Sequence, residues 1–411
     1  MALKGTTILQ SFVPETTLSE NPATGREAPA APTRDNGRSM ANVTFVTGFP
    51  GFLGTRLVAS LLAADSAAQI VALVEPRMAR QAAAAAAVLD PERVEILPGD
   101  IAKRRLGLDQ SVHDRLAAEM TSAYHLAAIY NLAVPLEIAQ RVNVDGTGNV
   151  IELCARADGL QRFNYVSTAY VAGVRKGVVY EHELLMGQRF KNHYESTKFQ
   201  AEVWVRDAMT TVPTTIYRPA IVVGDSRTGQ TQKFDGPYYL LRMLQRLRER
   251  NLPIPQIGRS TAPFNVVPVD FVIDAMVAAA GDPQSMGETF HLVDPEPLQA
   301  SQLLGMLSQE YLGRGTDYRV PGPVVAESLR IKPLQRFLGG TPRESIRYLN
   351  HEVRFDTRRT GDMLARQGLR CPSFSEYVKP VVDFFRRHED DPAFLGEAKP
   401  QQSEPSEQVF A

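Results

Sequence analysis

A glycine-rich turn, TGFPGFLG at residues 47–54, constrains the fold of this chain more than any other feature. It follows an alternating β-branched run and opens an apolar helical pattern, and this order of strand, turn and helix indicates a dinucleotide site. Gly48 permits a backbone turn barred to residues with a Cβ atom, Gly51 permits close approach of a pyrophosphate, and Gly54 permits close helix packing. The N–H groups that start the helix would meet the phosphates. The predicted cofactor contacts come from Gly48, Phe49, Pro50, Gly51, Phe52, Leu53 and Gly54.

Short β-branched runs alternate with longer helical patterns as far as residue 223, which is typical of a doubly wound parallel α/β sheet, the Rossmann fold. The expected strands are 43–47, 70–75, 94–97, 123–126, 163–167 and 214–218. The expected helices are 53–64, 77–88, 108–119, 136–156, 191–210, 239–250, 269–280 and 375–388. The last three helices lie among polar loops and proline-rich turns, which predict a smaller lobe at the carboxyl edge of the sheet.

Four parts of the chain are therefore expected. Residues 1–39 are rich in Pro, Thr, Ser and Ala without apolar periodicity, and we expect a disordered extension there. The dinucleotide-binding Rossmann domain is expected over 40–224 and a substrate-binding lobe with a lid over 225–394. A loose polar tail is expected over 395–411.

Composition narrows the class of protein. The 411 residues carry a net charge of −1 with scattered basic residues, so no nucleic-acid partner is expected. Cys154 and Cys371 form neither a disulfide framework nor a metal-ligand spacing, so we expect a reducing cytoplasmic location and no metal. No apolar run reaches the roughly 18–20 residues that a membrane span needs.

Tyr194 and Lys198 lie four residues apart in a helical pattern, so both side chains project from one face of the helix. A lysine there can bond a cofactor ribose, and its charge can lower the pKa of the tyrosine. The phenol can then exchange a proton with a substrate oxygen while hydride moves to or from a nicotinamide. Thr168 follows the preceding strand, where its hydroxyl would face a substrate carbonyl. These three residues are the predicted catalytic groups.

Further motifs occur in order along the chain: GDI at 99–101, HLAA at 125–128, NVDGT at 143–147, VSTAY at 166–170, YESTK at 194–198 and YRPAIVVG at 217–224. With the glycine turn they resemble the extended short-chain dehydrogenase/reductase superfamily. Within it they most resemble the thioester reductase and fatty acyl-CoA reductase branch, which has a male-sterility-type NAD-binding domain.

The resemblance assigns roles to individual residues. It implies that Thr168 is the catalytic hydroxyl, Tyr194 the acid/base and Lys198 its activator. It implies cofactor contacts from Asp100 and Ile101 at the adenine, from Ala127 and Ala128 at the nicotinamide ribose, and from Pro219, Ala220 and Ile221 at the nicotinamide. Beside these residues we expect Asn143 to brace the sheet and His125 and His193 to be packing residues.

The end of the second expected strand bears on the choice of cofactor. Reductases of this branch commonly carry Arg where Glu75 stands, to bind the 2′-phosphate of NADP. A carboxylate usually accepts the ribose hydroxyls of NAD instead. Arg77 and Arg80 follow closely and can supply the positive charge if Glu75 turns away. We therefore expect NADP, with NAD as the second choice.

The resemblance implies an NAD(P)H-dependent oxidoreductase that reduces a fatty acyl thioester, on coenzyme A or a carrier protein, to an aldehyde or alcohol. A secondary-alcohol or sterol-type dehydrogenase and a nucleotide-sugar epimerase stay open, because both use the same Thr/Tyr/Lys set. A non-catalytic dinucleotide-binding regulator is a third hypothesis, although it would not require all three groups. The polar loop 225–238 can be a substrate lid or a plain connector.

Overall fold

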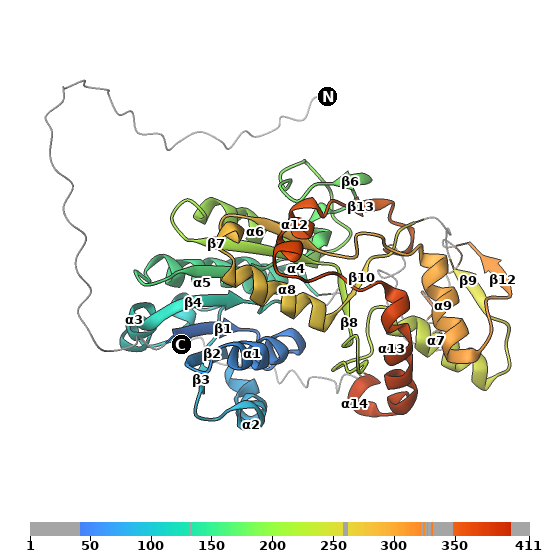
Figure 1. Cartoon of the computed structure of the whole chain (residues 1–411), viewed down its shortest axis with the longest axis horizontal. Coiled ribbons are helices and arrows are strands. Elements are labelled where there is room, and N and C mark those ends of the chain that lie inside the picture. The colour runs from blue at the N-terminus through green and yellow to red at the C-terminus, as the bar shows by residue number, and fades with distance from the viewer. Residues whose placement is uncertain are drawn as a thin grey trace, which may run out of the picture. The chain divides into compact units, whose positions relative to one another are not determined.

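The structure is a computed structural model that describes residues 42–130, 134–257, 262–321, 324, 327, 330–331 and 348–395. Within these residues, a seven-stranded parallel sheet runs in the order β11-β7-β5-β4-β1-β2-β3 (Figure 1). Its strands are β1 (Asn42–Thr47), β2 (Ala68–Val74), β3 (Val94–Pro98), β4 (Met120–His125), β5 (Arg162–Val166), β7 (Thr214–Pro219) and β11 (Thr289–Leu292). The order reverses at β1, which pairs with β2 on one side and β4 on the other. Doubly wound folds bind ligands at such a switch point, and the predicted fold class is confirmed.

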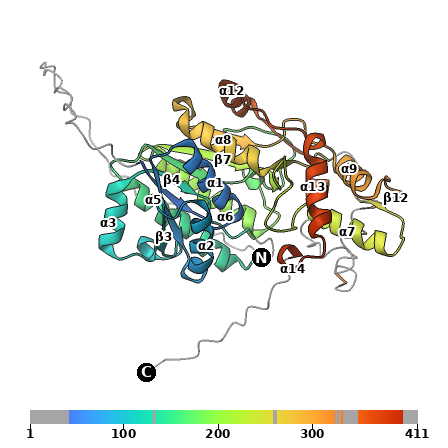
Figure 2. The ribbon, with the colours of Figure 1, turned by 60° about the horizontal axis from the view of Figure 1, so that its bottom comes forward.

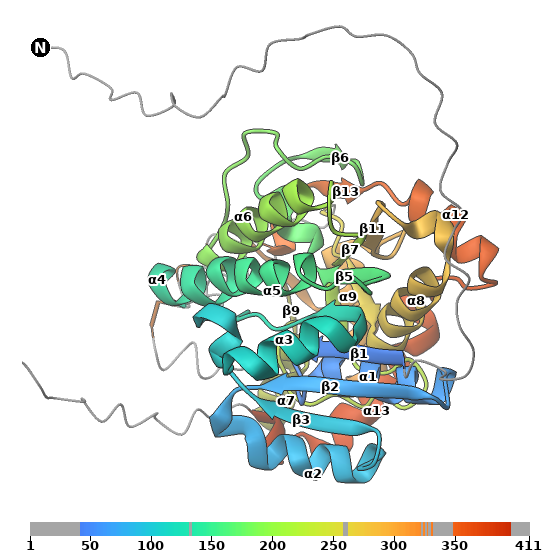
Figure 3. The ribbon, with the colours of Figure 1, turned by 90° about the vertical axis from the view of Figure 1, so that its left-hand side faces the viewer.

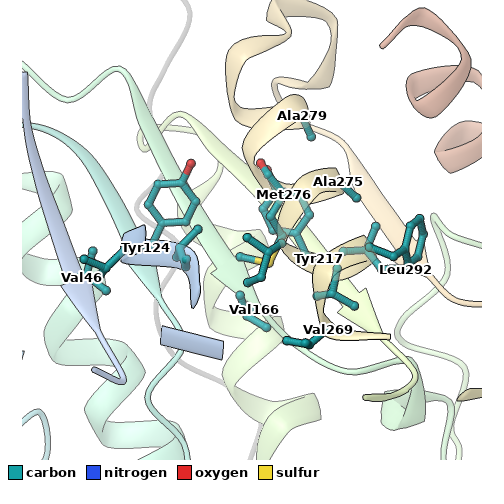
Figure 4. Close-up of a cluster of buried hydrophobic side chains, with 14 of the residues drawn as sticks. Val46, Tyr124, Val166, Tyr217, Val269, Ala275, Met276, Ala279 and Leu292 are labelled. Atoms are coloured by element: carbon teal, nitrogen blue, oxygen red, sulfur yellow. The ribbon is translucent and has the colours of Figure 1, made fainter. Parts of the chain in front are cut away.

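Helices cover both faces of this sheet (Figure 3). Successive residues of β1 show the two layers, since Phe45 and Val46 point to opposite faces and join different hydrophobic clusters. The Val46 cluster, part of which is drawn in Figure 4, includes α1 (Phe52–Ala64), α2 (Ala79–Leu89) and α8 (Val269–Gly281). The Phe45 cluster includes α3 (Gln110–Glu119), α5 (Gly146–Ala155) and α6 (His193–Ala208).

The single helix expected over 136–156 is wrong in its middle. The segment consists of α4 (Leu136–Ala139), a π-helical turn over Gln140–Asp145, and then α5. A π-helical turn shifts the side chains that follow it, and such turns often occur at functional sites. Asn143 lies in this turn and is buried.

A second hydrophobic core forms around α7 (Tyr238–Glu249), α9 (Ala300–Leu312) and α13 (Phe374–His388), which lie together in Figure 2. Pairs of short parallel strands lie outside the central sheet. They are β8 (Ile221–Val223) with β10 (Val266–Pro268), β9 (Pro255–Ile257) with β12 (Tyr318–Val320), and β6 (Gly177–Val179) with β13 (Val353–Phe355). Two further α-helices among the described residues are α12 (Arg358–Arg366) and α14 (Pro392–Leu395).

Elements beyond residue 224 also belong to the central sheet and its covering helices. Helix α8 and strand β11 lie beyond residue 224, yet β11 pairs with β7 and α8 packs on α1. The segments expected to be disordered or loose, 1–39 and 395–411, lie outside the described residues except for Leu395 at the end of α14. Among the described helices, none combines the length and apolar character that crossing a bilayer needs.

Candidate active site

The predicted site residues follow the strands of the sheet at one edge. Gly48 follows β1, Glu75 follows β2, Asp100 follows β3 and Thr168 follows β5 at short intervals. Because the strands are parallel, their carboxyl ends lie at the same edge. The motifs spread over the chain are therefore brought to one side of the sheet.

The backbone itself closes the glycine turn between β1 and α1. The N–H of Gly51 donates to the carbonyl of Gly48 at 2.9 Å, and Gly48 has a φ of 93°. A Cβ atom would lie 2.7 Å from the Gly48 oxygen if placed on Gly51, and 2.4 Å from it if placed on Gly54. No side chain in the described part of the chain caps α1, so its first N–H groups can receive a phosphate. These features fit the predicted dinucleotide.

Thr47 and His125 connect this turn to the end of β4. The Thr47 hydroxyl lies 2.7 Å from His125 Nδ1 and accepts the N–H of Ala127 at 3.2 Å. His125 Nε2 lies 3.0 Å from the hydroxyl of Thr147 in α5. Burial, with a smaller contribution from Lys198, lowers the pKa of His125 to about 3, so the ring is neutral. His125 is thus a buried hydrogen-bonded group that fixes the backbone leading to Ala127.

The predicted adenine contacts lie past β3. Asp100 Oδ1 accepts the N–H of Ala102 at 2.9 Å, which holds the carboxylate in its own turn. The carbonyl of Ile101 accepts from Asn149 of α5 at 2.7 Å, and the Ile101 side chain is buried. The two residues are therefore held firmly between the sheet edge and α5.

The three predicted catalytic residues come together. Thr168 caps the short helical turn Ala169–Ala172 by accepting the N–H of Tyr170 at 3.3 Å, and its hydroxyl also donates to the Pro219 carbonyl at 3.4 Å. Helix α6, which carries Tyr194, contacts the helical turn that Thr168 caps, and Thr168 lowers the pKa of the Tyr194 phenol against the larger effect of burial. Lys198 lies one helical turn further along α6, with a buried ammonium.

The pKa values of these groups differ from the sequence-based expectation. Lys198 Nζ donates to the carbonyl of Val166 at 2.7 Å and lies 4.4 Å above the ring of Tyr165. Burial lowers the pKa of Lys198 to about 7, against an opposing effect of Glu202. Burial raises the pKa of Tyr194 to about 12. Burial therefore dominates the pKa of Tyr194 in the protein alone, and the lowering by Lys198 stays a prediction.

An ion pair beneath the catalytic residues was missed by the sequence analysis. Glu202 of α6 and Arg218 of β7 are both buried, with Glu202 Oε1 2.6 Å from Arg218 Nη2. Ser167, next to Thr168, donates to Glu202 Oε2 at 2.6 Å. The available signal was an arginine inside the YRPAIVVG strand, because a charge in a buried strand requires a partner.

Asn143 and His193 differ in detail from expectation. Asn143 Oδ1 accepts the N–H of Ile129 at 2.8 Å, and its Nδ2 donates to the Ile129 carbonyl and to Thr197 Oγ1 at 3.1 and 3.0 Å. It therefore braces the segment after β4 against α6 rather than a neighbouring strand. His193 is exposed at the first position of α6, so the expectation that it packs in the interior is wrong.

The first half of loop 225–238 is fixed to the protein. Asp225 Oδ2 lies 2.9 Å from Arg56 Nη1 of α1, and the N–H of Ser226 donates to Asp270 of α8 at 2.8 Å. A Cβ atom on Gly229 would lie 2.0 Å from the carbonyl oxygen of Pro380 in α13. These contacts favour a connector rather than a lid for this half of the loop.

A tyrosine and a lysine on one helix, beside a threonine at the edge of a doubly wound sheet, place the protein among the extended short-chain dehydrogenases/reductases. A comparison with models of protein families identifies one family. The chain belongs to the NAD-binding family described as male sterility protein, whose model matches residues 46–276.

Individual relatives agree with this family. The chain is 27% identical over 379 residues to one subunit from the linear gramicidin synthase of Brevibacillus parabrevis, an alignment that covers 85% of this chain and 7% of that protein. It is 29% identical over 291 residues to the L-2-aminoadipate reductase large subunit of Penicillium chrysogenum, covering 64% and 20%. The chain thus spans a small part of these relatives. The solved terminal R domain from the myxalamid PKS-NRPS biosynthetic pathway is similar at a TM-score of 0.73 and 26% identity, covering 87% of this chain and 93% of that one.

Proposed function

We propose that this chain reduces an acyl thioester to an aldehyde, with NADPH as the hydride donor. The observation that carries the proposal is the contact between helix α6, which carries Tyr194, and the turn capped by Thr168, at the sheet edge that also bears the glycine turn. Two hydroxyls within reach of each other can both donate to one carbonyl oxygen on which negative charge develops. The similarity to a gramicidin synthase and to an aminoadipate reductase supports a reductive step on an activated acyl group.

Tyr194 and Thr168 have distinct tasks in this reaction. NADPH supplies the hydride when it is bound. Tyr194, with a pKa of about 12, keeps its proton at neutral pH and donates it to the substrate oxygen while Thr168 donates a second hydrogen bond. When the adduct collapses, the carbonyl re-forms, the proton returns to Tyr194, and the carbon–sulfur bond breaks to release thiolate and aldehyde. A second reduction of the aldehyde, again protonated by Tyr194, would give the alcohol.

The contact between Glu75 and Arg77 supports NADP over NAD. Glu75 Oε1 lies 2.7 Å from Arg77 Nε in an ion pair, so the carboxylate faces the arginine. The Arg77 side chain is 63% exposed, and its terminal nitrogens can bond a 2′-phosphate bidentately. The negative charge of Glu75 is therefore offset by the arginine, so it opposes a phosphate less. NAD is the second choice.

The relatives also bear on how the acyl group arrives. A carrier-bound thioester is favoured over coenzyme A, because one relative belongs to a gramicidin synthase and the similar solved structure belongs to a PKS-NRPS pathway. Aminoacyl and fatty acyl chains are both candidates. The cytoplasmic location stays a prediction, and Cys154 and Cys371 are both free thiols.

A substrate panel tests the proposal. Acyl-CoAs, acyl groups on a carrier protein, aldehydes, sterols and nucleotide sugars should be followed by nicotinamide absorbance with NADPH and with NADH, and the products identified. We expect NADPH oxidation with acyl thioesters and aldehyde or alcohol as product. Turnover of sterols or sugars without turnover of any thioester would instead favour the dehydrogenase or epimerase alternatives.

A further inference from the structure

A buried ion pair adjoins the proposed proton donor. Lys191 and Glu195 lie 3.0 Å apart, and their side chains are 4% and 0% exposed. The N–H of Lys191 donates to Glu195 Oε2 at 2.9 Å, while the N–H of Glu195 donates to the side chain of Asn192 at 2.9 Å. Glu195 directly follows Tyr194 in the first turn of α6. A buried ion pair adds little net stability, because desolvation offsets its attraction. Its position beside Tyr194 therefore suggests a role in the reaction.

The ammonium of Lys191 bridges the two elements that carry the catalytic hydroxyls. It donates to the carbonyl of Gly173 at 2.7 Å, at the end of the helical turn that Thr168 caps. It also donates to Glu195 at 3.0 Å, in the turn of α6 that carries Tyr194. One side chain thus bonds the backbone that follows Thr168 and the side chain that follows Tyr194.

A residue far along the chain completes this cluster. The hydroxyl of Tyr348 donates to Glu195 Oε1 at 2.7 Å and accepts from Asn192 Nδ2 at 2.8 Å. Its ring packs edge-on against Tyr170 at 4.9 Å, and Lys191 Nζ lies 4.9 Å from its centroid. The carboxylate of Glu195 therefore accepts from an ammonium, a phenol and the backbone N–H of Lys191.

The charges around Tyr194 give this cluster an electrostatic consequence. After burial, which dominates, the Glu195 carboxylate contributes to raising the pKa of Tyr194. Lys191 supplies the opposing positive charge. Among the residues that the structure describes, Tyr170 and Tyr348 interact electrostatically with Glu195, and His351 interacts with Lys191. Tyr130, from the loop after β4, interacts with Tyr194 itself.

We propose that Lys191 is a positioning residue for the reduction: its ammonium neutralises Glu195 beside the proton donor Tyr194. This inference rests on the proposed function of Tyr194. Without Lys191, the uncompensated carboxylate would oppose the loss of a proton from the adjacent phenol, and transfer to the substrate would slow. Without both charges, that opposition would disappear.

The test is a pair of variants read by kcat and by the KM for NADPH, with the best acyl thioester of the panel. We expect Lys191→Met to lower kcat about tenfold, the effect of about one unit in the pKa of a donor, with the KM for NADPH unchanged. Lys191→Met/Glu195→Gln should recover most of that loss. Lys176→Met is the matched control, because Lys176 pairs with Glu352 at an exposed site and should leave kcat unchanged.

The outcomes separate this inference from the proposed function. A purely structural tie would make the double variant as poor as Lys191→Met or poorer, and that result would overturn the inference. A wild-type kcat in Lys191→Met would overturn the inference as well. If kcat is then still lowered in Tyr194→Phe, the proposed function stands. Wild-type kcat in Tyr194→Phe would overturn both. If Lys191→Met does not fold, Tyr348→Phe decides: a kcat at least threefold lower with unchanged KM for NADPH supports the inference, and an unchanged kcat overturns it.

Discussion

Tyr194 gives the most direct prediction at the scale of single residues. Tyr194→Phe keeps the ring and removes the proton that the proposed reaction needs. We expect NADPH binding within a few-fold of the wild type and a turnover lower by about 10²–10⁴, the usual contribution of a general acid. Isothermal titration and steady-state kinetics measure the two quantities. Near-normal turnover would show that another group donates the proton.

Lys198 predicts a pH dependence of stability. Its pKa is about 7 in the folded protein, against an ordinary value of 10.5. Between these values the unfolded chain holds a proton that the folded protein lacks, so the free energy of unfolding rises with pH across this window. Lys198→Met should flatten the rise by about 1 kcal/mol per pH unit. Urea unfolding of both proteins at pH 7, 8 and 9 checks this, and parallel pH profiles would contradict it.

Glu75 and Arg77 decide the cofactor in opposite ways. If Arg77 binds the 2′-phosphate, the wild type should have the higher kcat/KM with NADPH, and Arg77→Ala should reduce that preference by about 1–3 kcal/mol. Glu75→Ala should leave NADPH use unchanged or improve it. Both variants need assay with both nucleotides. A wild-type preference for NADH, damaged specifically by Glu75→Ala, would reverse the choice of cofactor.

The glycine turn gives a prediction at the scale of elements. Gly51→Val places a branched side chain where a Cβ atom alone would lie 2.7 Å from the Gly48 oxygen. We expect loss of nucleotide binding with the fold retained, although the turn itself must shift. Gly305→Val is the control, because a Cβ atom there meets nothing within 4 Å. Unchanged NADPH titration of Gly51→Val would remove the basis for placing the dinucleotide at this turn.

Predictability differed between elements for physical reasons. The strands that carry the motifs were predicted within a few residues, because each is a β-branched run beside a turn or helix signal. Strand β11 was missed because its four residues, Thr289–Leu292, are buried throughout and show no alternation. The π-helical turn at Gln140–Asp145 was missed because a helical apolar pattern does not reveal a single extra residue in a turn.

In the candidate site, too, some features were predicted from the sequence and others were not. Thr168, Tyr194 and Lys198 were predicted because motif spacing places them on adjacent elements. The pairing of Glu202 with Arg218 and the contact of Tyr348 with Glu195 were not, because each joins residues far apart in sequence. Local patterns predict which residues share an element, whereas the partners of buried charges depend on the tertiary fold.

Glu181 gives a prediction at the scale of the whole molecule. Its fully buried carboxylate accepts the N–H groups of Arg359 and Thr360 at the start of α12, at 2.8 and 3.0 Å, and that of His291 in β11 at 3.2 Å. It thus joins the edge strand of the sheet to a helix near the C-terminal end of the described chain. Glu181→Ala would leave these buried donors without an acceptor.

We expect Glu181→Ala to lower the free energy of unfolding by about 3 kcal/mol or more, since each buried donor left unsatisfied costs about 1–3 kcal/mol. Glu352→Ala is the matched control, because its exposed pair with Lys176 should contribute less than about 1 kcal/mol. Urea denaturation measures both. Because Glu181 lies away from the glycine turn in the chain and touches β11 and α12, folded Glu181→Ala protein should still bind NADPH normally. Equal stability of the two variants would show that water or neighbouring groups replace the lost carboxylate.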